Sequence, residues 1–197
     1  MTELRDAEDR VDEAAAAPPR ATFRSFEEST KEEWDLIIPH LAVTQEMVAD
    51  HVIHLLKALE SDHGGFPVSR LEHSLQTATR AEEDGRDEEY VMCALLHDIG
   101  DTLAPYNHPE IAASIVKTRV SEANHFMVAN HGIFQGYYFW HYIGADRNAR
   151  EQFRGHEYFD HTEEFCAKYD QTAFDPDYTS ATLEYYEPAI RRLFAQR

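Results

Sequence analysis

The chain has 197 residues, a length that suits one globular domain and is too short for two domains of ordinary size. Of these residues 43% are hydrophobic and 28% are charged, as is usual for a globular protein. Its formal net charge of −19 argues against nucleic-acid binding through a basic surface, because that mode needs clustered Lys and Arg. No apolar run approaches the ~18 residues of a membrane span, and the first residues lack a secretory-signal layout. We therefore expect a soluble cytoplasmic protein with neither a nucleic-acid nor a membrane partner.

The N-terminal region differs in composition from the rest of the chain. Residues 1–21 are Ala-rich and charged, with few large apolar groups to offset the entropy of ordering, so we predict a disordered tail. Residues 22–197 are assigned to a single helical domain. Ser25 and Glu28 are spaced like a capping box before a first helix, and Thr44 is placed to cap the next.

Helical patterns continue through the remainder of the sequence. A helix through Leu71 and Leu75 follows the Gly64-Gly65 turn, and the segment from Asp87 to Ile99 is apolar nearly all round, which predicts a central buried helix. No alternating strand pattern and no internal repeat appear, so the predicted fold class is all-α. Further helices are expected over 111–120, from 121 to 131–132, and around 145–153, 162–174 and 182–194.

The central helix ends in an unusual pair, His97 and Asp98. An ionisable pair on the most buried helix costs several kcal/mol unless it is compensated, and a bound divalent cation is the usual compensation for imidazole and carboxylate ligands. Adjacent residues on a helix point about 100° apart, so the pair naturally serves a site that other helices complete.

Four more candidate ligands lie on other predicted helices, each beside apolar neighbours. A lone histidine is more often a core or cap residue, but six such residues on successive helices are harder to explain that way. One ion could use five ligands, whereas four histidines and two carboxylates suit two ions that share a carboxylate. Asp98 is the better bridge candidate because it neighbours a ligand. The predicted metal ligands are His73, His97, Asp98, His108, His131 and Asp170.

Other residues near these positions have plainer interpretations. Cys93 and Cys166 each lie four residues before a candidate ligand, and we interpret both as buried free thiols. Gln76 follows His73 by three residues and is predicted to support that ligand or to contact substrate.

The pattern His73, His97-Asp98, Asp170 resembles the H…HD…D signature of HD-domain metalloproteins, which fold as helical bundles. The resemblance covers about residues 62–195. His108 and His131 match the extra histidines of dinuclear members. The strings Leu71–Gln76 and Ala94–Gly100 are similar to those of the phosphonate-cleaving HD oxygenases, relatives of myo-inositol oxygenase. The resemblance implies two iron ions, as an Fe(II)/Fe(III) pair, that use O₂ to break a C–C or C–P bond.

The sequence departs from that subfamily in one stretch and at one further residue. A Tyr and a Glu that cover the vacant iron in relatives are replaced here by the stretch His63-Gly64-Gly65-Phe66-Pro67. Asp101 stands where relatives hold a substrate-contacting His or Lys. A carboxylate there would repel a phosphonate and would suit a cationic or hydroxyl-rich group. The resemblance therefore implies the metal site more strongly than the known substrates.

These observations lead to a first hypothesis and two rivals. The first is a non-haem di-iron oxygenase that uses O₂ to oxidise and cleave a small polar amino or hydroxy metabolite, with Asp101 and Gln76 at the substrate. The second is a phosphohydrolase of phosphate esters or nucleotides that uses Mn²⁺ or another divalent metal. This hypothesis is weakened because the chain has only four lysines, and because no basic cluster lies next to a candidate ligand apart from Arg70, Arg80 and Lys168. The third is a metal-stabilised binding protein without turnover.

Overall fold

A computed structural model describes residues 19–61 and 64–195 of the chain. Within these residues it contains eight α-helices and no strands, so the predicted all-α class is confirmed. The predicted tail lies almost wholly outside the described residues. The described part holds no helix with the length and apolar character that a transmembrane span needs. Its contacts divide the chain into two compact units, residues 1–45 and 46–197, and the prediction of one domain over 22–197 stays a prediction.

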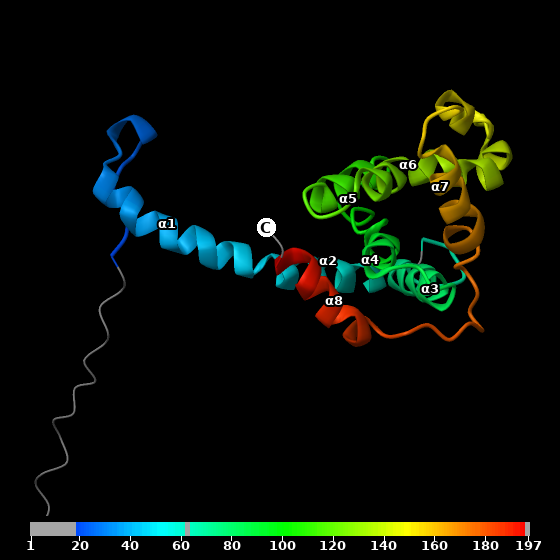
Figure 1. Ribbon diagram of the computed structural model, residues 1–197, viewed down its shortest axis with the longest axis horizontal. Helices are drawn as coiled ribbons and strands as arrows, with labels where there is room; N and C mark the ends of the chain where they lie inside the picture. Colours follow the sequence, from blue (N-terminus) through cyan, green and yellow to red (C-terminus); the bar gives the residue numbers. More distant parts are fainter. Residues whose placement is uncertain (1–18, 62–63, 196–197) are drawn as a thin grey trace, which may run out of the picture. The chain divides into compact units, whose positions relative to one another are not determined.

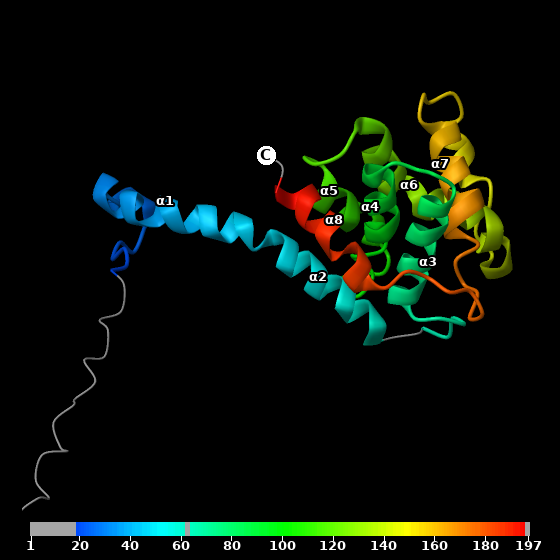
Figure 2. The same cartoon turned by 60° about the horizontal axis from the view of Figure 1, so that its bottom comes forward.

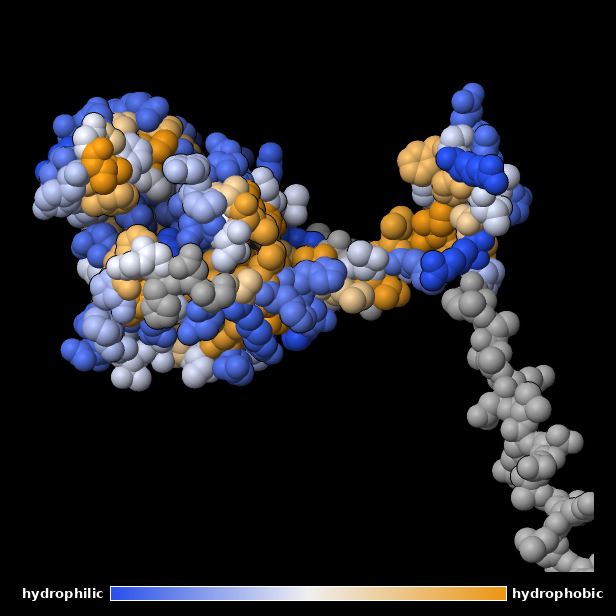
Figure 3. Space-filling view, turned by 180° about the vertical axis from the view of Figure 1, so that it is seen from behind, coloured by the Kyte–Doolittle hydropathy of each residue, from blue (hydrophilic) through white to orange (hydrophobic). Residues whose placement is uncertain are grey.

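The first unit is built around α1 (Lys31–Glu46) and a short turn, η1 (Phe26–Glu28). The capping box belongs to Thr30 and Glu33 rather than to Ser25 and Glu28: the Thr30 Oγ1 accepts from the Glu33 N–H at 3.3 Å, and the Thr30 N–H donates to the Glu33 carboxylate at 3.1 Å. Thr44 does not begin a new helix, since its hydroxyl donates to the His40 carbonyl inside α1. The exposed large apolar side chains of this unit, visible as its orange surface in Figure 3, belong to α1 and to Phe26 of η1.

The second unit is a bundle around α4 (Glu88–Leu96), which contacts α3 (Arg70–Glu83), α6 (Glu122–Phe139) and α8 (Leu183–Ala195) (Figures 1 and 2). Every α4 residue from Tyr90 to Leu96 is buried, as the all-round apolar pattern predicted. Asp87 and Ser121 cap α4 and α6 through their side chains. The bundle is completed by α2 (Val48–Ala58), α5 (His108–Val116), α7 (Phe159–Phe165) and short turns at η2 (Leu59–Ser61), η3 (Trp140–Ile143) and η4 (Ala149–Phe153).

Two segments differ from their predicted form, and both matter for the site. α6 does not end at Gly132 but continues to Phe139. Glycine at position 136 is explained by close packing, since a Cβ there would lie 2.4 Å from the Trp140 indole. The helix predicted around 162–174 stops earlier, passing from α7 into one π-helical turn, η5 (Cys166–Asp170). That turn ends at Asp170 and directs its side chain toward α3 and α4.

Candidate metal centre

The six predicted ligands come from five segments and meet at one place in the bundle. His73 lies in the first turn of α3, His97 and Asp98 follow the end of α4, and Asp170 ends η5. His108 begins α5 and His131 lies midway along α6. Five of the six are buried, and the His108 side chain is 16% exposed.

Each of the four histidines uses its Nδ1 atom to bind a backbone carbonyl. The distances are 3.0 Å from His73 to Ala173, 2.7 Å from His97 to Ala94, 2.7 Å from His108 to Pro105 and 2.8 Å from His131 to Val128. A carbonyl oxygen can only accept, so each Nδ1 carries the hydrogen and each neutral ring presents an Nε2 lone pair. This is the tautomer that a metal-binding histidine needs.

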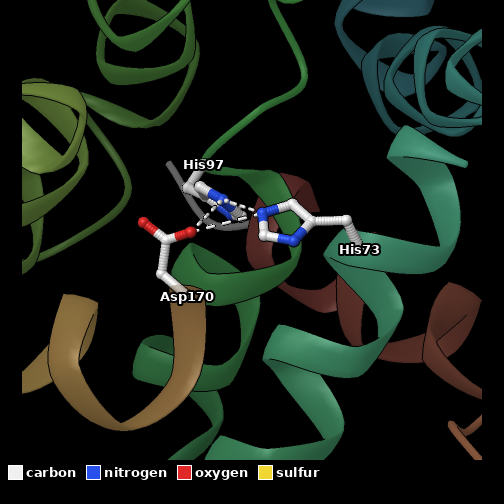
Figure 4. A group of neighbouring side chains, drawn as sticks. All are labelled: His73, His97 and Asp170. Atoms are coloured by element: carbon white, nitrogen blue, oxygen red, sulfur yellow. Dashed lines mark hydrogen bonds and ion pairs between the residues drawn. The ribbon is translucent and has the colours of Figure 1, made fainter. Parts of the chain in front are cut away.

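The Asp98 carboxylate lies between two pairs of these Nε2 atoms. Its Oδ2 is 3.4 Å from the Nε2 of both His73 and His97, and its Oδ1 is 3.0 Å from that of His108 and 3.2 Å from that of His131. Asp170 joins the first pair, with its Oδ1 3.3 Å from His73 Nε2 and 3.7 Å from His97 Nε2 (Figure 4). One oxygen of Asp98 therefore faces each pair.

The arrangement fits divalent metal ions better than it fits hydrogen bonding. The Nε2 atoms of His73 and His97 lie 3.1 Å apart, and those of His108 and His131 lie 3.2 Å apart, yet each pair consists of two acceptors. Ligands at ~2.1 Å from a metal are ~3.0–3.4 Å from one another in octahedral or tetrahedral geometry, which matches these spacings. The buried Oδ2 of Asp170 receives no hydrogen bond from the described residues. Two sets of these residues have ligand atoms within 4.8 Å of one another and could each hold a metal ion: His73 with His97 and Asp170, and His97 with Asp98 and His131.

Electrostatics favour the ligand forms of His97, Asp98 and Asp170; at His108, burial would lower the pKa, but the contacts with Asp98 outweigh it and raise that pKa. Burial lowers the pKa of His97 to about 4, so its imidazole is neutral near pH 7. Burial alone would raise the pKa of Asp98, but its interactions with His97, Arg70 and the other histidines hold it well below the ordinary value. Burial would also raise the pKa of Asp170, but His73 and His97 lower it, so that this pKa lies below the ordinary value. The two carboxylates are therefore ionised.

Arg70 is a site residue that the sequence analysis set aside. It opens α3 one turn before His73, and this i, i+3 spacing was the signal that could have placed it on the ligand face. Its guanidinium donates to Asp98 Oδ2 and, through Nε at 3.0 Å, to Asp101 Oδ2. Burial would lower the pKa of Arg70, but Asp98 and Asp101 raise it, so the guanidinium stays protonated.

Asp101 lies at the edge of the cluster, and its predicted contact with substrate stays a prediction. Its side chain is 22% exposed, and its Oδ1 is 3.6 Å from His108 Nδ1. Arg70 forms an ion pair with the other oxygen, Oδ2, and so partly neutralises the negative charge of Asp101, which the sequence alone suggested was unpaired. The Oδ1 atom remains the more open acceptor beside the second histidine pair.

Gln76 lies one turn beyond His73 and is fully buried. Its amide pairs with the backbone of Asp175 and with Glu72, so in this arrangement it contacts the segment after η5 and not the Nε2 atoms of the cluster. The expected substrate contact of Gln76 stays untested. Residue 63 of the covering loop lies outside the described residues, and Phe66 stacks on Phe174, which in turn stacks on His73.

Gln135 is a second residue that the sequence analysis missed. It lies one turn beyond His131 on α6, and its Nε2 donates to Asp170 Oδ1. Because the predicted helix ended at Gly132, this i, i+4 relation was hidden. Cys93 and Cys166 are free and buried, as expected, and burial raises the pKa of both thiols.

Comparisons with known proteins agree with this geometry. Residues 70–146 match the family model of the HD domain, a segment that holds all the cluster residues except Asp170. A [1-hydroxy-2-(trimethylamino)ethyl]phosphonate dioxygenase (glycine-betaine-forming) from Leisingera caerulea is 51% identical to the chain over 41 residues. That stretch covers 21% of this chain and 21% of the length of the relative.

Proposed function

Since the chain carries an HD domain, we propose that it is a di-iron oxygenase that uses O₂ to oxidise and cleave a small polar metabolite with an amino or hydroxyl group. The observation that carries the proposal is Asp98, whose two oxygens face two separate histidine pairs. A single-metal site has no need of that arrangement. The partial similarity to a phosphonate dioxygenase supports the oxygenase chemistry.

In this proposal the six residues divide into two ligand sets. His73, His97 and Asp170 would hold one iron, His108 and His131 the other, and Asp98 would bridge them. The bound irons would supply the one-electron chemistry that allows reaction with O₂. The protein excludes water through burial and holds every histidine in the ligand tautomer by a backbone carbonyl.

The surroundings of the cluster support a substrate with a cationic or hydroxyl group. Arg70 is held by two carboxylates, and this lowers its capacity to bind a further anion. Asp101 keeps one oxygen beside His108, where it can accept a hydrogen bond from an amine or a hydroxyl. The net charge of −19 fits the proposal that the partners are this metabolite and O₂, and not a nucleic acid.

A metal-dependent phosphohydrolase is the second candidate. One observation favours it: Arg70 places a guanidinium at the cluster, and guanidinium groups bind phosphate well. In that case Mn²⁺ or another divalent ion would take the place of iron and activate water.

One paired assay separates the two candidates. Iron-loaded protein is screened for O₂ uptake with amino and hydroxy compounds, and Mn²⁺-loaded protein is screened for phosphate release from nucleotides and phosphate esters. We expect O₂ uptake that depends on an amino or hydroxy compound. Phosphate release without O₂ uptake would replace the oxygenase proposal with the hydrolase.

A further inference from the structure

His73 differs from the other three histidines in how its ring is held. His97, His108 and His131 each bond the carbonyl of the residue three positions earlier, so their own turn of the chain sets the tautomer. His73 instead bonds the carbonyl of Ala173, 100 residues away. Its tautomer therefore depends on the placement of a distant, non-helical segment.

Three consecutive residues of that segment contact α3. The Ala173 carbonyl accepts from His73 Nδ1 at 3.0 Å, and the Phe174 ring stacks on the His73 imidazole with centroids 4.3 Å apart and planes 19° apart. The next residue, Asp175, meets Gln76. The segment thus touches the ligand and, one helical turn on, a buried glutamine.

Gln76 binds the Asp175 backbone at two points. Its Nε2 donates to the Asp175 carbonyl at 2.7 Å, and its Oε1 accepts from the Asp175 N–H at 3.2 Å. An amide side chain presents a donor and an acceptor side by side, which an ionised carboxylate of the same length cannot do. Its Nε2 also donates to Glu72, which fixes the orientation of the amide.

We infer that Gln76 is a positioning residue that, by pairing with Asp175, holds the Ala173 carbonyl and the Phe174 ring against His73. This inference rests on the metal centre proposed above. Gln76 then fixes the Nδ1–H tautomer of His73 and orients the His73 Nε2 toward His97 and Asp170. Gln76 itself contacts neither metal nor substrate. Loss of such an outer partner typically weakens metal binding by about 10- to 100-fold.

The test reads the tautomer of His73 directly. The full chain, freed of metal by chelation, is labelled with ¹⁵N-histidine, and long-range ¹H–¹⁵N spectra are recorded for wild type, Gln76→Met and Gln76→Glu. Methionine keeps the length of the side chain without either hydrogen bond, and glutamate cannot donate to the Asp175 carbonyl when ionised. The control is Thr79→Val, which removes a hydroxyl on the same helix that accepts from Ala181, farther along the same connection.

We expect a single Nδ1–H tautomer for His73 in wild type and Thr79→Val, and a mixture of tautomers in both Gln76 variants. Iron titration should show that binding to the site of His73, His97 and Asp170 is weakened at least about tenfold in the Gln76 variants. A wild-type tautomer in the folded variants would overturn the inference. If wild type binds no metal but the variants still change the tautomer, the proposed function fails and the positioning role stands.

Discussion

At the scale of single residues, Asp98 carries the largest share of the proposed centre. It is a buried carboxylate beside four imidazoles and one guanidinium. If it bridges two cations, its loss leaves both without their shared anion, whereas loss of one histidine removes one ligand from one ion.

Asp98→Asn should therefore reduce bound iron from two to fewer than one per chain. His131→Ala should leave about one, because the first ligand set stays complete. Metal analysis of the purified variants measures both values, with the exposed Asp160→Asn as the control for a lost carboxylate. An Asp98→Asn protein that keeps two irons would rule out the bridging role.

Asp101 tests the choice of substrate rather than the metal centre. A charge-assisted hydrogen bond from a substrate amine or hydroxyl is worth roughly 1.5–3 kcal/mol. Asp101→Asn keeps the shape and removes the charge, so we expect KM to rise about tenfold or more for the amino or hydroxy substrate while two irons stay bound. Steady-state O₂ uptake gives KM. An unchanged KM would show that Asp101 does not contact the substrate.

The six residues selected from the sequence lie in one cluster, but the sequence could not reveal the side chains that surround them. The His–Asp pair on an apolar helix and the histidines beside apolar neighbours are visible in one dimension. Arg70 and Gln135 were not assigned, because an arginine or a glutamine near a ligand has no pattern of its own until the helix faces are known. The pairing of Gln76 with Asp175 joins positions 99 residues apart, and no local pattern encodes that contact.

At the scale of elements, the glycines of α6 show why helix ends were hard to predict. Glycine commonly ends helices, and Gly132 was interpreted in that way. In the structure Gly136 lies inside α6, and its missing side chain leaves room for the Trp140 indole at the end of the helix. Close packing decides the residue at this position, against helix propensity.

Gly136→Ala should consequently destabilise the protein. Alanine gains up to about 1 kcal/mol of helix propensity, but overpacking against an indole typically costs about 1–3 kcal/mol, and the second effect should win. We expect a lower Tm, by ~2–4 °C for each kcal/mol lost.

Gly132→Ala is the matched control on the same helix. Its Cβ would meet only the Pro109 ring, at 3.2 Å, so Tm should stay near wild type or rise. Differential scanning calorimetry measures both variants. A Gly136→Ala protein as stable as Gly132→Ala would contradict the packing argument.

Other elements followed from local chemistry. The α4 pattern, apolar on every side, predicted the central helix, and Ser121 capped α6 as expected. The π-helical turn η5 could not be predicted, because its sequence reads as a continuation of α7. That single turn matters for the site, since it ends the helix at Asp170.

At the scale of the whole molecule, the predicted all-α class is confirmed, and the match of residues 70–146 to the HD-domain family model supports the predicted resemblance. Length and composition suited one globular domain, but they contained no information on how the chain divides. The contacts separate residues 1–45 from 46–197, and all six cluster residues belong to the second unit. The proposed metal ligands therefore all come from that unit.

In the proposed centre, one carboxylate joins two metal ions. The decisive experiment is Mössbauer spectroscopy of protein reconstituted with ⁵⁷Fe, together with metal analysis. We expect two irons per chain that are spin-coupled through a shared bridge, and loss of that coupling in Asp98→Asn. One iron per chain, or two irons without magnetic coupling, would contradict it.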